Sequence, residues 1–185
     1  MANTNEKKLI QRFNQGDQDA LCQIYQQYKH DLFGFDLSML RDAHTAEDLV
    51  HDVFVRMAQQ SSRFTLTGSL KGYLLTSTAN RVRDHGRLKS RRDVSLEQTA
   101  PPAEESPSPE TCLIRTEDSR RFWKVILQIP YEQREVLLLH CHYDLKFREI
   151  ARAQGVSINT IQSRYRYGLE KAASLLKEGV DNEIP

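Results

Sequence analysis

The chain has 185 residues, with 26 Lys/Arg against 25 Asp/Glu, a formal net charge of +1 and three cysteines. This length allows one domain or two small ones. An odd number of cysteines without a Cys-x-x-Cys pair argues against a disulfide framework and favours the reducing cytoplasm. No apolar run is long enough to span a bilayer, and none follows a basic start, so we expect neither membrane insertion nor export.

The charged residues are gathered in blocks that the net charge conceals. Residues 63–92 hold eight Lys/Arg and one acidic residue, whereas residues 93–112 hold five acidic residues and no Lys/Arg. Residues 113–171 are basic again, with eleven Lys/Arg against seven Asp/Glu. Two separate basic blocks predict two separate contacts with a polyanion such as nucleic acid.

The first sixty residues predict helices throughout. A short helix should end at Gly16, and Asp17 should cap a longer one that continues to about Leu40. A third helix is expected from Thr45 to Gln60, with Thr45 and Asp48 forming a variant of the capping box. The residues of this helix expected in the core are Ala46, Leu49, Val50, Val53 and Met57.

The opposite face of that third helix carries Asp48, Asp52, Val55 and Gln59. A solvated polar face is the simplest interpretation of such residues. However, an apolar Val55 among acids also hints at a protein partner whose surface is basic and partly apolar.

A loop at residues 61–68 contains one aromatic residue, Phe64, and Ser69 should cap a long helix that ends near Arg92. The residues expected to pack inward are Leu70, Leu74, Leu75, Ala79 and Val82. The basic residues left outside are Lys71, Arg81, Arg83, Arg87, Lys89, Arg91 and Arg92. Cations beside Phe64 and Tyr73 suit single-stranded nucleic acid, because bases stack on aromatic rings. The alternative is that the basic residues complement the helix dipole, but this explains only two or three of them.

Residues 93–110 hold four of the six prolines and five acidic residues, a composition typical of an extended linker. We therefore expect an N-terminal domain at residues 1–92, a linker at 93–111, a C-terminal domain at 112–178 and a tail at 179–185. The C-terminal domain should contain a helix from Glu117 to Gln128 and another from Tyr131 to Tyr143. Its first helix is expected to bury Phe122, Trp123, Ile126 and Leu127. His140, Cys141 and His142 are adjacent on a helix and point in different directions, so no metal site is expected.

The residues from Phe147 to Leu176 have the spacing of a helix-turn-helix. Gly155 ends one helix and Ser157 caps the next. The face of the second helix expected to be apolar carries Ile158, Ile161, Tyr165 and Leu169. Its polar side carries Asn159, Thr160, Gln162, Ser163, Arg164, Arg166 and Tyr167. These side chains suit contacts with base edges and phosphates in a major groove, although a surface helical hairpin remains an alternative.

Three segments in this order resemble extracytoplasmic-function (ECF) sigma factors, which are specificity subunits of bacterial RNA polymerase. They run from Ala46 to Met57, from Ser69 to Arg87 and from Ile129 to Ala172. The resemblance extends from about Gly16 to Leu176. It implies an all-α fold of two small helical domains, the second with a helix-turn-helix, and a cytoplasmic, non-enzymatic protein without cofactor or metal.

The resemblance also implies partners and residue roles. Contacts with the clamp helices of the largest subunit of core RNA polymerase would come from Asp48, His51, Asp52, Val55 and Gln59. Contacts with minus-ten promoter DNA would come from Arg63, Phe64, Lys71, Tyr73, Asn80, Arg81, Arg83, Asp84 and Arg87. Contacts with minus-thirty-five DNA would come from Asn159, Thr160, Gln162, Ser163, Arg164, Arg166 and Tyr167. The loop at 63–68 would accept a flipped base, the acidic linker would follow the polymerase's channels, and an anti-sigma factor is a further partner that the resemblance allows.

Some positions depart from the family's pattern. Tyr73 stands where many members have Trp, and Gln162 and Tyr167 stand where Lys or Arg is common. The alternative function is a stand-alone helix-turn-helix regulator, which would bind duplex DNA tightly without polymerase. An enzyme is not expected, because the sequence has no Gly-rich phosphate loop or nucleophile motif.

Overall fold

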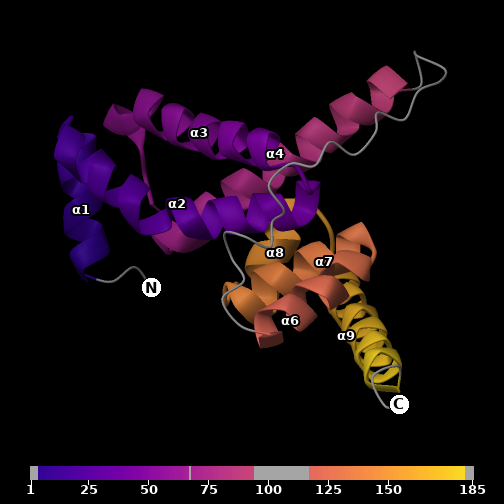
Figure 1. Ribbon diagram of the computed structural model, residues 1–185. Helices are drawn as coiled ribbons and strands as arrows, with labels where there is room; N and C mark the ends of the chain where they lie inside the picture. The colour runs from indigo at the N-terminus through magenta and orange to yellow at the C-terminus, as the bar shows by residue number, and fades with distance from the viewer. Residues whose placement is uncertain (1–3, 67, 94–116, 182–185) are drawn as a thin grey trace. The chain divides into compact units, whose positions relative to one another are not determined.

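The computed structural model describes residues 4–66, 68–93 and 117–181, and all regular structure in these ranges is helical (Figure 1). The all-α prediction is therefore confirmed. The chain divides into two compact units, residues 1–106 and 107–185. Most of the predicted linker and the end of the predicted tail lie outside the described residues, so the predicted domain boundaries remain predictions. No helix in the described ranges is both long and apolar enough to cross a membrane.

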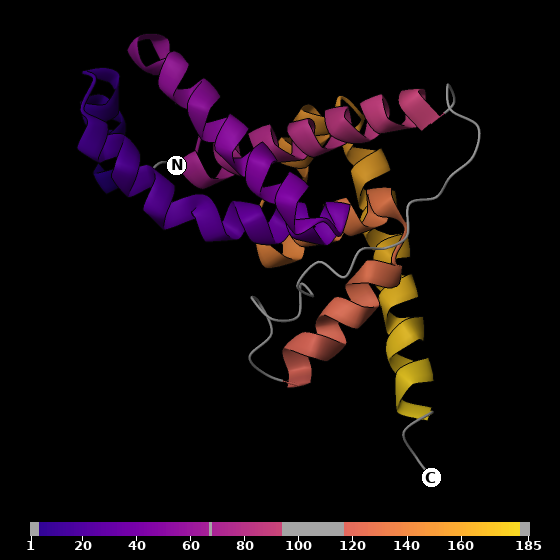
Figure 2. The same ribbon diagram turned by 45° about the horizontal axis from the view of Figure 1, so that its top comes forward.

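The N-terminal unit is built around its second helix. Its elements are α1 (Thr4–Asn14), α2 (Gln18–Leu40), α3 (Ala43–Gln59), the short 3-10 helix η1 (Ser61–Arg63) and α4 (Leu70–Asp93). Helix α2 contacts α1, α3 and α4. These four helices form the indigo-to-magenta part of Figure 2. Its Ile24, Leu32 and Phe35 are fully buried, as are Leu70, Leu74 and Leu75 of α4. Burial of these side chains holds the helices together.

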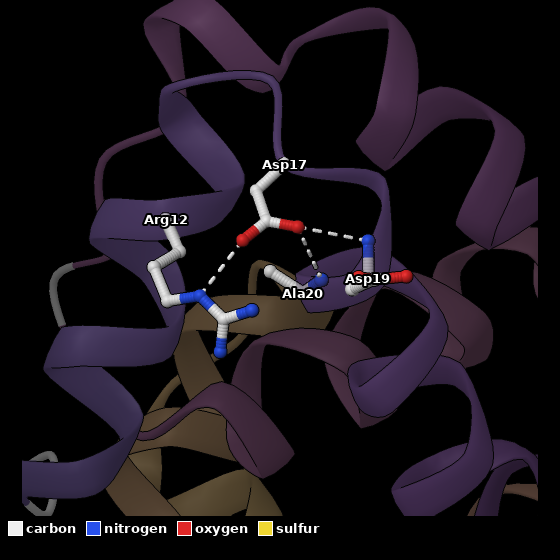
Figure 3. Close-up of polar contacts among 4 residues, drawn as sticks. All are labelled: Arg12, Asp17, Asp19 and Ala20. Atoms are coloured by element: carbon white, nitrogen blue, oxygen red, sulfur yellow. Dashed lines mark hydrogen bonds and ion pairs between the residues drawn. The ribbon is translucent and has the colours of Figure 1, made fainter.

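The turn between α1 and α2 follows the sequence prediction. Gly16 has φ +84°, a conformation that glycine adopts without strain. Asp17 Oδ1 accepts hydrogen bonds from the backbone N–H groups of Asp19 at 2.9 Å and Ala20 at 3.2 Å (Figure 3). Its Oδ2 accepts a hydrogen bond from Arg12 Nε at 2.7 Å. The bond from Arg12 and those from the backbone hold the pKa of Asp17 below its usual value.

The start of α3 differs from the prediction. The helix begins at Ala43, and its N-cap is Asp42, whose Oδ1 accepts from the N–H groups of His44 at 3.1 Å and Thr45 at 3.2 Å. The Thr45 hydroxyl donates to Asp42 Oδ2 at 2.6 Å. The predicted capping box of Thr45 and Asp48 is therefore wrong, because the Thr45 hydroxyl already serves the cap that precedes it.

The C-terminal unit contains α6 (Glu117–Gln128), α7 (Tyr131–Leu137), the π-helical turn η2 (Leu138–His142), α8 (Phe147–Gln154) and α9 (Ile158–Asp181). Helix α9 packs against α6, α7 and α8. The one helix predicted from Tyr131 to Tyr143 is thus α7 continued by a π-helical turn. That turn is closed by backbone hydrogen bonds from Tyr143 to Leu138 at 3.1 Å and from Leu145 to Leu139 at 2.8 Å.

The buried face of α9 also differs from the prediction. Ile161 is fully buried as expected, but Ile158 is 39% exposed and Leu169 42% exposed. The helix instead approaches α7 at Gly168, where a Cβ atom would lie 2.9 Å from Leu137 Cδ1. A residue without a side chain allows this close approach, and Leu169, one position on, points away from it. Phe122 of α6, predicted to be buried, is 40% exposed.

Candidate nucleic-acid and protein interfaces

One candidate surface is the solvent-facing side of α3. All the residues predicted there are exposed: Asp48, His51, Asp52, Val55 and Gln59. Val55 is 37% exposed even though it is apolar. Asp48 pairs with a histidine, its Oδ2 lying 3.2 Å from His44 Nδ1. The structure therefore brings an acidic, partly apolar strip together on one helix face.

A second candidate surface is the basic side of α4. Arg81 donates from Nη2 to Asp52 Oδ2 of α3 at 3.0 Å, and its side chain is only 22% exposed. This ion pair joins a residue of the predicted polymerase-binding surface to one of the predicted DNA-binding surface. This contact between α3 and α4 was not predicted from the sequence.

Other cations of α4 also have partners within the chain. Arg83 donates to Asn80 Oδ1 and, from Nε, to Ala79 O at 3.2 Å. Two further ion pairs join Lys71 to Asp31 at 3.2 Å and Arg87 to Asp84 at 3.8 Å. Arg63, Asn80, Asp84 and Arg87 are exposed, and Tyr73 is half-buried. Since these ion pairs lie at the surface, each is weak enough for a phosphate to replace the carboxylate.

The structure does not place Phe64 as a stacking surface for bases. Its side chain is 6% exposed, and its ring packs edge-on between Phe13 at 5.8 Å and Tyr73 at 4.9 Å. The backbone carbonyl of Phe64 accepts a hydrogen bond from Asn14 Nδ2 at 2.8 Å. Phe64 therefore anchors the loop to α1 and α4, in correction of its predicted exposure to DNA.

An open cavity of about 550 Å³ lies between α1 and this loop. Its lining consists of Lys7, Ile10, Gln11, Asn14, Gln15, Phe64, Thr65 and Leu66. Among the described residues, Asn14 Oδ1 is buried without a hydrogen-bond partner. Sequence reasoning missed the α1 side of this cavity. The signal available was Lys7, Gln11 and Asn14, which are polar residues at helical spacing on one face.

The helix-turn-helix forms as the spacing predicts. Gly155, with φ +66°, ends α8, and Ala151 is buried where α8 meets α9. Ser157 Oγ accepts a hydrogen bond from the backbone N–H of Thr160 at 3.1 Å, so it caps α9. The hydroxyl of Thr160 also lies 2.9 Å from Ser157 Oγ.

The predicted DNA-reading residues of α9 are not equivalent. The exposed ones are Asn159, Gln162, Ser163, Arg166 and Tyr167. Thr160 is half-buried. Arg164 is also half-buried, and its guanidinium contacts Glu132 and Gln154. Arg166 instead lies along the surface, 4.9 Å from the ring of Tyr167.

The histidine and cysteine cluster has structural contacts. His140 Nδ1 lies 2.8 Å from the Leu145 carbonyl, and its ring packs 4.1 Å from that of Phe147. The ring of His142 packs on Phe122 at 6.2 Å. Among the described residues, no group of three potential metal ligands comes together.

The sequence matches two consecutive family models. Sigma-70 region 2 matches residues 24–92, and Sigma-70, region 4 matches residues 119–171. These regions fall on the N-terminal and C-terminal units respectively. The N-terminal unit has acidic and basic faces, and the C-terminal unit has a helix-turn-helix. Together with the two family matches, these features identify the class of protein as a transcription initiation factor.

Curated relatives cover nearly the whole chain. RNA polymerase sigma factor CarQ of Myxococcus xanthus is 29% identical over 91% of this chain and 96% of its own length. ECF RNA polymerase sigma factor SigW of Bacillus subtilis is 25% identical, covering 93% of this chain and 97% of its own. RNA polymerase sigma-H factor of Pseudomonas aeruginosa is 25% identical over 94% of this chain and 96% of its own length.

Two solved structures have the same fold. The sigma factor RpoE in complex with the anti-sigma factor NepR from Bartonella quintana has a TM-score of 0.65, with 24% identity over 84% of this chain and 95% of that one. CnrH in complex with the cytosolic domain of CnrY has a TM-score of 0.66, with 18% identity over 94% of this chain and 97% of that one. The chain belongs to the sigma-70 family and, like its relatives, is an ECF-type RNA polymerase sigma factor that directs promoter-specific transcription.

Proposed function

We propose that the exposed face of α3 is the surface that binds core polymerase. The residues assigned to it are Asp48, His51, Asp52, Val55 and Gln59. The observation that carries this assignment is the exposed apolar Val55 one turn from Asp52, because an interface needs a desolvated apolar centre with charges around it. The partner's matching surface would be the clamp helices of its largest subunit, with a basic, partly apolar character.

The same unit would recognise and open the minus-ten element. The cations of the surface ion pairs, Lys71 and Arg87, would replace their intramolecular carboxylates with phosphates of the separated strand. The cavity beside residues 64–66 is large enough for a nucleobase, and α1 lines it with the polar residues Lys7, Gln11 and Asn14. A base extruded from the stack costs a few kcal/mol, which such a pocket would offset in part.

The C-terminal unit would bind the minus-thirty-five duplex through the exposed side of α9. Gln162 and Ser163 suit base edges, and Arg166 suits a phosphate. One recognition helix with so few reading groups gives modest affinity by itself. Contacts with polymerase and with the minus-ten element would supply the rest of the affinity for the promoter.

We also propose a further protein partner and a location. The two structural neighbours described above were solved with an anti-sigma factor and with the cytosolic domain of CnrY, which supports a similar protein partner for this chain. The proposed location is the cytoplasm, and the proposed role is non-enzymatic. The acidic segment at residues 93–112 would serve as the linker between the two promoter contacts.

The test is transcription in vitro with purified core polymerase on promoters obtained by mapping transcription starts after overexpression. Open complexes should form only when the protein and the core are both present. Tight, sequence-specific duplex binding by the protein alone would instead indicate a stand-alone regulator. Absence of promoter-specific initiation with the core would contradict the proposal.

A further inference from the structure

Arg164 lies on the recognition helix, but its guanidinium faces the protein. Nη2 forms an ion pair with Glu132 Oε2 at 2.5 Å, and Nη1 donates to Gln154 Oε1 at 2.6 Å. The side chain of Arg164 is 21% exposed, whereas that of Glu132 is 66% exposed. Both terminal nitrogens of the guanidinium are thus engaged within the C-terminal unit.

The three residues come from three different helices. Glu132 lies in the first turn of α7, Gln154 is the last residue of α8, and Arg164 lies in the second turn of α9. Because a guanidinium is planar, two bonds from its ends fix both partners in one geometry. The network therefore holds α9 against the end of α8 and the start of α7, on both sides of the turn at Gly155.

A phosphate contact by Arg164 would place that phosphate close to the Glu132 carboxylate. Two anions at one guanidinium repel each other, and losing the Glu132 pair would remove one of the contacts that hold α9 to α7. Arg166, two residues on, has no such constraint. Its side chain is 63% exposed, and it forms only a long ion pair with the equally exposed Glu170, at 3.9 Å.

We propose that Arg164 is a positioning residue that sets the angle of the recognition helix, and that it does not read or hold DNA. The inference rests on the proposed binding of minus-thirty-five DNA by α9. It implies that Glu132, which belongs to no DNA-reading surface, is as important for promoter recognition as Arg164.

The experiment compares holoenzymes carrying Arg164→Gln, Glu132→Gln, the exchange Glu132→Arg with Arg164→Glu, and Arg166→Gln as the matched control. Initiation is measured on a promoter library with a randomised minus-thirty-five element. We expect each of the first two variants to lose about tenfold in minus-thirty-five-dependent initiation, because a partly buried ion pair has lost one partner. Their base preferences should stay unchanged, and the exchange should restore activity to within about threefold of the original protein.

The control should behave differently. Arg166→Gln should weaken initiation and lower its salt dependence, because it would remove a phosphate contact. Thermal melts of every variant identify a temperature at which the C-terminal unit is folded, and initiation is measured at that temperature. If Arg164→Gln is unfolded at that temperature, Arg164→Lys replaces it in the comparison. Lysine keeps the charge but not the planar fork, so it should recover only part of the activity.

Three results would overturn the inference: full activity of Glu132→Gln, an exchange variant as inactive as Arg164→Gln, or an altered preference at one base position in Arg164→Gln. Failure of the proposed function itself is distinguishable. In that case the original protein and Arg166→Gln would initiate equally on every sequence of the library.

Discussion

Reversing the two acidic charges of α3 tests the assignment of the polymerase-binding surface. In the variant Asp48→Lys with Asp52→Lys, the acidic face becomes basic. The two positions are 70% and 52% exposed, so the fold should tolerate the change. The stability cost comes from Asp52, because its partner Arg81, 3.0 Å away, would face a like charge. Arg81 is only 22% exposed, but Asp52 is 52% exposed and water screens the pair in part, so we expect a loss of about 1 kcal/mol in the free energy of unfolding.

The effect on polymerase binding should be larger. An exposed charge pair contributes about 0.2–1 kcal/mol, and reversal replaces this attraction with a repulsion of similar size. Asp52 contributes less than Asp48 because Arg81 already neutralises it in part. Two reversals should therefore weaken core binding by about 2 kcal/mol, or roughly thirtyfold.

The assay is the anisotropy of fluorescently labelled protein titrated with core polymerase at low and at high salt. The control is Glu47→Lys, which makes the charge change of one of the two substitutions at an exposed position of α3, about a quarter turn from the acidic face. The control should bind almost normally, and the difference between the variants should shrink at high salt. Equal affinities for the double variant and the control would refute the assignment.

Three further predictions concern the interior of the units. Burial raises the pKa of Asp36 well above its usual value, so the free energy of unfolding should fall as pH rises from about 4 toward that raised pKa. In thermal melts between pH 4 and 8, Asp36→Asn should abolish this fall, and parallel curves of melting temperature against pH for the two proteins would contradict the prediction. Gly168→Ala should lower the free energy of unfolding by about 1–3 kcal/mol, because the added Cβ would overpack against α7. Gly86→Ala, whose Cβ would have open space, should raise it by up to about 1 kcal/mol. Equal shifts in the melting temperatures of the two variants would contradict the close approach of α9 to α7. Asn14→Leu should leave the backbone carbonyl of Phe64 without its hydrogen-bond donor, loosen the loop and slow open-complex formation, while the affinity for core polymerase stays constant. A proportional loss of core binding would contradict a role of this loop in promoter opening.

The sequence predicted the helices and their caps wherever one local signal was decisive. Asp17 and Ser157 cap helices as expected, and Gly155 has the positive φ that its position after α8 requires. The start of α3 was missed because Asp42 and Thr45 are both good capping residues. Only the structure decides which of two neighbouring caps forms.

The remaining errors come from contacts between helices, which a periodic pattern does not encode. Leu169 continues the apolar spacing of α9, but the close approach of α7 at Gly168 turns the buried face away from it. Phe64 was assigned to DNA because aromatic rings beside cations suit stacked bases and because of the family resemblance, whereas in the fold Phe13 and Tyr73 enclose its ring.

The same limit applies to the candidate surfaces. The exposure of Asp48, Val55 and Gln59 followed from helical spacing and is confirmed. The partners of Arg81 and Arg164 lie 29 and 32 residues away in the chain, at Asp52 and Glu132. Charge at such positions is visible in the sequence, but its neutralisation within the fold is not.

The most direct test of the account is footprinting of promoter DNA by holoenzyme, with permanganate to detect unpaired thymines. The account predicts protection of a minus-thirty-five element together with permanganate-reactive bases at the minus-ten element, and neither signal from the protein or the core alone. Protection of duplex DNA by the protein without core polymerase, with no strand opening when the core is added, would contradict it.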